Sequence, residues 1–278
     1  MLLLTLLRTT LAQAQTNAAN QPPTREKFKV YLLMGQSNMA GRGVPEKEDK
    51  TPHPRVFVLT QSNQWQVAVE PLTLGEKKKT PGVGPGLAFA KIMADANPGV
   101  SIGLVPCAVG GTPLKRWVKG GDLYENAVAR ARDAEKVGVL SGVLWHQGEA
   151  DSGSQTNAES YGDRLTKMIA DIRADLNSPK LPFVVGQTGE FNYTRPGDPQ
   201  PFARLVNETL SKIPDTVPNT GCALSKGLTS KPDLVHFDAA SQRELGKRYA
   251  AEMLRLEKAQ QKPARLKQAE SGRKLLKQ

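Results

Sequence analysis

The stretch FKVYLLM at residues 28–34, continued by GQSNMAGRG at residues 35–43, decides the fold. Its first half is apolar without strict alternation, which is typical of a parallel strand that is covered on both faces. Similar short apolar runs recur along the chain, at residues 100–105, 139–145, 183–187 and 221–224. These five runs predict a mostly parallel, five-stranded sheet at the centre of an α/β protein.

Helical patterns separate the apolar runs. Residues 158–176 carry apolar side chains at the three- and four-residue spacing of a helix with one buried face. Comparable patterns cover residues 85–97, 123–136, 202–213 and 239–256. Strand and helix in alternation predict right-handed crossovers and one doubly wound domain. Two short runs at residues 55–60 and 65–70 interrupt this order, and we expect them to form a β-hairpin excursion.

The ends of the chain differ from its middle in composition. Residues 1–25 open with MLLLTLLRTTLAQAQ, whose apolar run and Ala-Gln-Ala resemble the end of a secretory signal before a polar linker. We therefore expect a secreted or periplasmic protein with a folded domain at residues 26–258. Residues 259–278 are basic, and we expect them to form a frayed, solvated tail.

The net charge of +11 and the pI of about 9.6 invite a nucleic-acid interpretation. Much of this charge lies at one end, because residues 255–278 hold eight Lys or Arg against two Glu. We therefore expect no nucleic-acid partner, and the tail is a candidate contact for acidic polymers. No run of eighteen apolar residues occurs, which excludes an uninterrupted membrane-spanning helix.

Cysteine and histidine are both scarce in this chain. Cys107 and Cys222 cannot make a disulfide-rich scaffold or a multi-cysteine zinc site, and whether they pair with each other stays open. The histidines are scattered, at His53, His146 and His236. We therefore expect no metal and no cofactor.

Four polar clusters lie where an open α/β sheet binds its ligands, beyond the carboxyl ends of the strands. They are GQSNM at residues 35–39, GGT at 110–112, HQGE at 146–149 and DLVH at 233–236. A serine hydroxyl becomes a nucleophile when a histidine takes its proton and an acid fixes that histidine. Ser37, His236 and Asp233 are the candidates for these three roles.

The carbonyl that a serine attacks also needs hydrogen-bond donors for its developing oxyanion. The candidate donors are the backbone N–H groups of Ser37 and Gly110 and the side-chain amide of Gln147. Glu149 is a rival or supporting acid, because a carboxylate after the third strand could also reach His236.

Together the clusters resemble the sialate O-acetylesterase-like (SASA) branch of the SGNH/GDSL hydrolases, which includes the acetyl xylan esterases of carbohydrate esterase family 6. GQSNMAGRG from residue 35 resembles the nucleophile block, and GGT from residue 110 resembles the second block. WHQGEAD from residue 145 resembles the third block, and DLVHF from residue 233 resembles the closing block. The blocks occur in the family's order across residues 28–250.

The resemblance implies a three-layer α/β/α sandwich of the flavodoxin-like SGNH type and a metal-free serine esterase that removes O-acetyl groups from carbohydrate through an acetyl-serine intermediate. It implies the roles already given for Ser37, His236 and Asp233, with Ser37, Gly110 and Gln147 around the oxyanion. We expect acetylated xylan or a related polysaccharide as substrate, because the chain looks exported and its excursion could line an open groove. The alternatives are a sialate O-acetylesterase and a non-catalytic carbohydrate-binding module on the same fold.

Other polar residues have simpler interpretations. We expect His146 to be a satisfied, semi-buried histidine, His53 to be exposed and Arg42 to pair with a carboxylate. Lys115, Arg116 and Arg195 are candidate charges at the rim of a site.

Overall fold

The structure, a computed structural model, describes residues 22–73, 81–194 and 200–275, with side chains up to residue 261. Most of the predicted signal and linker at residues 1–25 lies outside these ranges. Arg195 lies outside them too. In the described part, Cys107 and Cys222 are free thiols. A search of the described helices finds none that is long and apolar enough to cross a membrane.

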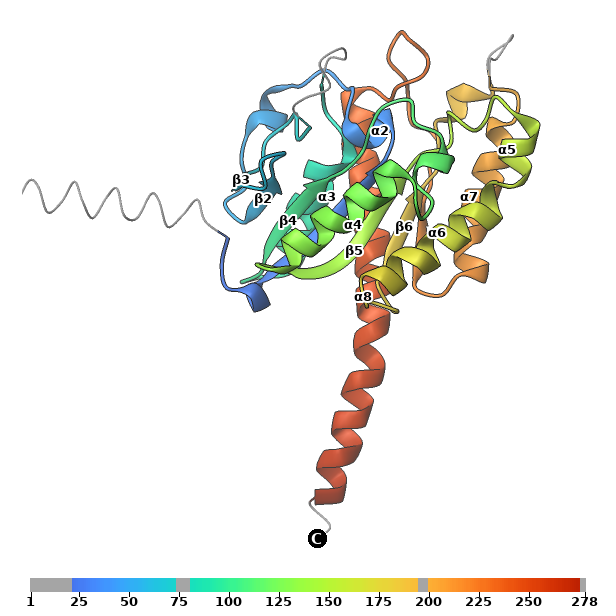
Figure 1. The fold of residues 1–278 in the computed structure, drawn as a ribbon. Helices are drawn as coiled ribbons and strands as arrows, with labels where there is room; N and C mark the ends of the chain where they lie inside the picture. Colours follow the sequence, from blue (N-terminus) through green and yellow to red (C-terminus); the bar gives the residue numbers. More distant parts are fainter. Residues whose placement is uncertain (1–21, 74–80, 195–199, 276–278) are drawn as a thin grey trace, which may run out of the picture.

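A seven-stranded sheet forms the centre of the domain, with the strand order β3-β2-β4-β1-β5-β6-β7 (Figure 1). All neighbouring pairs are parallel except β2 and β3. The strands are β1 (Phe28–Gly35), β2 (Val56–Leu59), β3 (Trp65–Val67), β4 (Ser101–Pro106), β5 (Val139–His146), β6 (Phe183–Gly186) and β7 (Thr220–Ala223).

The prediction of five strands is therefore wrong by two. The excursion does form a hairpin, but it extends the sheet because β2 pairs with β4 in parallel while β3 pairs with the other side of β2. Every residue of β2 is buried, so a hairpin that projected into solvent would expose four large apolar side chains.

Helices cover both faces of the sheet, which confirms the predicted three-layer α/β/α sandwich (Figure 1). One face packs on α3 (Pro85–Ala96) and α8 (Ala239–Leu275). The other packs on α4 (Asp122–Glu135), α6 (Tyr161–Asp175) and α7 (Ala203–Thr216). The short elements are α2 (Ser37–Ala40), α5 (Gln155–Glu159), η1 (Arg25–Lys27), η2 (Lys47–Lys50), η3 (Leu114–Arg116) and η4 (Glu190–Asn192).

The central strand β1 contributes to two cores because its side chains alternate between the faces. Tyr31 and Leu33 belong to the core under α3 and α8, whereas Val30 and Leu32 belong to the core under α4 and α6. The continuous apolar run at residues 28–34 thus reflects a strand that is buried on both sides.

The C-terminal helix is longer than its apolar pattern. The spacing of apolar residues predicts an end at Leu256, but α8 continues to Leu275 and extends beyond the rest of the domain (Figure 1). Whether the segment at residues 259–278 frays in solution stays a prediction.

The junction between β1 and α2 brings two of the polar clusters together. Gly35 pairs with His146 at the ends of β1 and β5, and the N–H of Gln36 donates to the carbonyl of His146 at 2.9 Å. Gly35 has φ of +130°, and a Cβ at this position would lie 2.1 Å from the carbonyl oxygen of His146. Only glycine allows this close approach, which starts the turn toward Ser37.

Candidate active site

Ser37, His236 and Asp233 form a hydrogen-bonded chain at the carboxyl edge of the sheet. The His236 Nε2 lies 3.0 Å from the Ser37 Oγ, and its Nδ1 lies 3.0 Å from the Asp233 Oδ2. Ser37 is the first residue of α2, whereas Asp233 and His236 belong to the loop between β7 and α8. The structure therefore brings together three residues that the sequence predicts as a nucleophile, a base and an acid.

A tight turn holds Asp233 against the histidine. Its Oδ1 accepts hydrogen bonds from the backbone N–H groups of Val235 and His236 at 3.0 and 2.9 Å, while Leu234 adopts φ of +54°. Burial raises the pKa of Asp233, but the hydrogen bonds from His236 and Val235 outweigh it and lower the pKa to about 2. Asp233 is consequently a carboxylate at neutral pH, and its other oxygen, Oδ2, faces the imidazole.

A cavity of about 640 Å³ opens over these residues. Its lining consists of Gln36, Ser37, Arg42, Gly111, Glu149, Ala150, Gln200, Lys231, Asp233, Val235 and His236. It combines the nucleophile and base with amides, small residues and two cations, and such a polar, open cavity suits a hydroxyl-rich ligand.

The backbone donors predicted for the oxyanion come from Ser37 itself and from Gly110. The N–H of Ser37 belongs to the first residue of a helix, where backbone N–H groups have no partner within the helix. Gly110 directly precedes Gly111, which lines the cavity. The role of these two N–H groups at the oxyanion stays a prediction.

Gln147 does not agree with its predicted role as a side-chain oxyanion donor. Its Nε2 donates to the carbonyl of Thr112 at 3.2 Å and to the Asp151 Oδ2 at 2.7 Å, which uses both amide hydrogens. Its Oε1 accepts from the Tyr161 hydroxyl at 2.9 Å. Gln147 is fully buried, and these contacts agree with a structural role for its amide rather than with a role at the oxyanion.

Glu149 lines the cavity but is not bonded to the base. Its Oε1 accepts from the Asn38 Nδ2 at 2.6 Å, while both ring nitrogens of His236 are engaged by Ser37 and Asp233. Burial raises the pKa of Glu149, and the hydrogen bond from Asn38 opposes this rise. The geometry thus favours Asp233 over Glu149 as the acid that contacts His236.

The other two histidines have structural surroundings. His146 is fully buried and not semi-buried as predicted; its Nδ1 lies 3.1 Å from the Tyr249 hydroxyl, and burial lowers its pKa to about 3. Its Nε2 lies 3.9 Å from Glu149 and has no hydrogen-bond partner among the described residues, so the ring is not fully satisfied. His53 was expected to be exposed, but its side chain is only 18% exposed and its Nε2 lies 3.2 Å from the Asp95 Oδ1.

Sequence reasoning missed Lys231 among the cavity residues. Its Nζ lies 3.7 Å from the Asp233 Oδ2, and its side chain is 28% exposed. The available signal was its position two residues before Asp233 on the same loop. Arg42, for which a carboxylate partner was expected, lines the same cavity and donates from a guanidinium nitrogen to the carbonyl of Gly41 at 2.7 Å.

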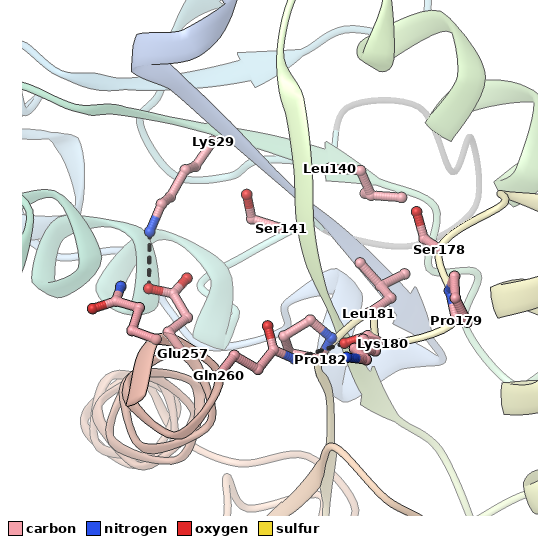
Figure 2. Close-up of a pocket in the computed structure, with 11 residues that line it drawn as sticks. Lys29, Leu140, Ser141, Ser178, Pro179, Lys180, Leu181, Pro182, Glu257 and Gln260 are labelled. Carbon is pink, nitrogen blue, oxygen red and sulfur yellow. Dashed lines mark hydrogen bonds and ion pairs between the residues drawn. The ribbon is translucent and has the colours of Figure 1, made fainter. Parts of the chain in front are cut away.

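A second cavity, of about 560 Å³, lies where β1 and β5 begin, at the edge of the sheet opposite Ser37 (Figure 2). Lys29 and Glu257 form an ion pair of 2.9 Å across it, and the Gln260 amide donates to the carbonyl of Lys180 at 2.7 Å. These two contacts tie α8 to the sheet, and the described lining of this cavity includes neither histidine nor cysteine.

Comparison with known proteins agrees with the geometry. A family model described as "Carbohydrate esterase, sialic acid-specific acetylesterase" matches residues 27–255. A protein of Arabidopsis thaliana named "Probable carbohydrate esterase" is 35% identical over 236 residues, with coverage of 78% of this chain and 87% of the relative.

Solved structures with the same fold include one of a protein from Arabidopsis thaliana. It is 34% identical, has a TM-score of 0.72, and the match covers 81% of this chain and 97% of the other. The structure of NanS is 20% identical with a TM-score of 0.70, and the match covers 85% of this chain and 99% of the other. At that identity the likeness to NanS concerns the fold.

Proposed function

Because the chain belongs to the carbohydrate esterase family of sialic acid-specific acetylesterases and is therefore a carbohydrate esterase, we propose that it removes O-acetyl groups from carbohydrate by way of an acetyl-Ser37 intermediate. The observation that carries this proposal is the chain of two 3.0 Å hydrogen bonds from Ser37 through His236 to Asp233, inside an open polar cavity.

The proposed reaction has two halves. The Ser37 Oγ attacks the acetyl carbonyl while the His236 Nε2 accepts its proton, and Asp233 stabilises the resulting imidazolium. The backbone N–H groups of Ser37 and Gly110 donate to the oxyanion. The tetrahedral intermediate then releases the sugar hydroxyl, which takes the proton from His236. Water then attacks acetyl-Ser37 while His236 accepts its proton; acetate is freed as His236 returns that proton to the Ser37 oxygen.

As substrate we propose an O-acetylated polysaccharide such as acetylated xylan. The volume of the cavity and the uncharged residues Gln36, Gly111 and Ala150 in its lining support a sugar chain, which can bind through its hydroxyl groups beside the charged residues.

An O-acetylated sialic acid is the second candidate, and Lys231 is the observation that favours it. A sialic acid carries a carboxylate, which a lysine ammonium in the cavity could bind. Since Lys231 is partly exposed and also lies 3.7 Å from Asp233, we expect Lys231→Gln to lower kcat/KM by about fivefold more for a sialate substrate than for acetylated xylan.

The experiment that tests the function measures acetate release from acetylated xylan and from O-acetylated sialic acid. The samples are the wild type, Ser37→Ala, and the matched control Ser62→Ala, which changes an exposed serine near the hairpin turn. We expect release by the wild type and by Ser62→Ala, with and without chelator, and loss of release in Ser37→Ala. Release that persists in Ser37→Ala would refute the serine mechanism, and binding without release would favour the binding-module alternative.

A further inference from the structure

Asn38, the residue after the nucleophile, has a fully buried side-chain amide that reaches the loop of the base. Its Nδ2 donates to the carbonyl of Val235 at 3.2 Å, and its Oδ1 accepts from the N–H of Phe237 at 3.1 Å. These two backbone groups belong to the residues on either side of His236. The amide of Asn38 therefore holds the backbone of the base from both sides, next to the residue that carries the hydroxyl.

This arrangement works in only one orientation of the amide. If the Asn38 side chain turned over, its oxygen would face the carbonyl of Val235 and its NH₂ would face the N–H of Phe237. Gln242 supports the observed orientation by donating to Oδ1 at 3.3 Å. Glu149 supports it more strongly, because its Oε1 accepts from Nδ2 at 2.6 Å, the shortest of the four contacts.

Glu149 has no other hydrogen bond from a described side chain through which to influence the base. Its second carboxylate oxygen is buried and has no hydrogen-bond partner among the residues that the structure describes. The ring of His236 already contacts Ser37 and Asp233 with its two nitrogens. The hydrogen-bonded path from Glu149 to the base therefore runs through Asn38 and the backbone.

We propose that Glu149 is a positioning residue, which orients the Asn38 amide so that it holds the His236 backbone at hydrogen-bonding distance from Ser37. The carboxylate does not act as a second acid for the imidazole, and it does not bind substrate. This inference rests on the proposed roles of Ser37 and His236, and it gives the buried glutamate of the third block a task that is separate from that of Asp233.

A double-mutant cycle tests the proposed path, with 4-nitrophenyl acetate as substrate. We expect Glu149→Ala and Asn38→Ala each to lower kcat by about 10²-fold, the typical cost of displacing a catalytic group by about 1 Å, with KM unchanged. If Glu149 acts only through Asn38, the double variant falls no further than Asn38→Ala alone. A loss in the double variant equal to the product of the two single losses would overturn the proposal.

The conservative variant Glu149→Gln separates positioning from acid catalysis. Its amide oxygen can still accept from Asn38, so we expect it to recover most of the activity that Glu149→Ala loses and to leave the acidic limb of the kcat/KM pH profile in place. A shift of that limb as large as the shift in Asp233→Asn would make Glu149 a second acid, and a raised KM with intact kcat would make it a substrate ligand. Either result refutes the positioning role. Glu208→Gln, on the exposed face of α7, is the matched control.

Amide hydrogen exchange at Phe237 tests the same path without any turnover. The N–H of Phe237 is the donor to Asn38, so we expect its exchange to be about tenfold faster in Glu149→Ala and near wild type in Glu149→Gln, both made in the Ser37→Ala background. Unchanged protection in Glu149→Ala would overturn the proposal. If the wild type proved inactive on esters, the proposed function would fail while this measurement still decided the role of Glu149.

Discussion

Replacing Asp233 by asparagine should change which nitrogen of His236 carries the proton. The Oδ1 of Asp233 accepts two backbone N–H groups, so the asparagine oxygen must stay at that position to keep them satisfied. The asparagine NH₂ then occupies the place of Oδ2, 3.0 Å from the His236 Nδ1, and it can only donate there. The imidazole must accept at Nδ1 and carry its proton at Nε2, where it can no longer take the proton of Ser37.

The expected cost is about 10⁴-fold in kcat, the size of the effect when a triad acid becomes an amide and holds the wrong tautomer. The fold should change little, because the side chain of Asp233 is 39% exposed and exposed ion pairs contribute about 1 kcal/mol or less. The assay is the rate of acetate release from 4-nitrophenyl acetate, with Asp215→Asn as an exposed control and thermal unfolding as the check on folding. A kcat within about tenfold of wild type would show that Asp233 does not fix the tautomer, and the assignment of the acid would be wrong.

Three further outcomes follow from buried groups elsewhere in the domain. Burial raises the pKa of Glu70 to about 8 from an ordinary value of 4.5. The free energy of unfolding of the wild type should therefore fall by an amount on the order of 4 kcal/mol as the pH rises from 4.5 to 8. Urea titrations at several pH values should show this dependence in the wild type and a flatter one in Glu70→Gln. Gly35→Ala should destabilise the fold by about 3 kcal/mol or more, because its Cβ would meet the carbonyl of His146; urea unfolding with an unchanged midpoint would contradict this. Burial raises the pKa of Cys107 to about 11 and of Cys222 to about 12. A thiol reagent at pH 8 should therefore label the native protein slowly, and it should label two thiols per chain after unfolding. One labelled thiol, or none, in the unfolded chain would contradict the unpaired state.

The order of elements and the edge of the site could be predicted because they depend on local pattern. A continuous apolar run such as residues 28–34 is readable as a doubly covered strand, and the residues after it must emerge at the carboxyl edge. That logic predicted that Ser37, Gly110 and His236 lie at this edge, and the structure brings Ser37 and His236 within hydrogen-bonding distance there. It did not extend to the hairpin at residues 55–70, because pairing with β4 depends on which strand edge is left open by the rest of the sheet.

The direction of side-chain amides could not be predicted, because it depends on which donors and acceptors the folded chain brings around each amide. The Gln147 amide is engaged by two other side chains: its Nε2 donates to Asp151, and its Oε1 accepts from Tyr161, the first residue of α6. The partners of the Asn38 amide lie 111 to 204 residues away in sequence, so the motif around Ser37 could not indicate that this amide faces inward. A motif fixes which residue types meet, whereas the hydrogen-bond network fixes which atoms do.

The hydrogen bond between Ser37 and His236 spans 199 residues of sequence, and the base loop leads directly into α8. During synthesis, the nucleophile would emerge from the ribosome long before its base, and α3 would remain without the helix that it packs against. A hydroxyl without its base is a poor nucleophile, so a nascent chain should be chemically silent until nearly the whole domain has been made. Ester hydrolysis is therefore a direct measure of completed folding for this protein. The moment at which it appears during translation would show when α8 packs against the domain.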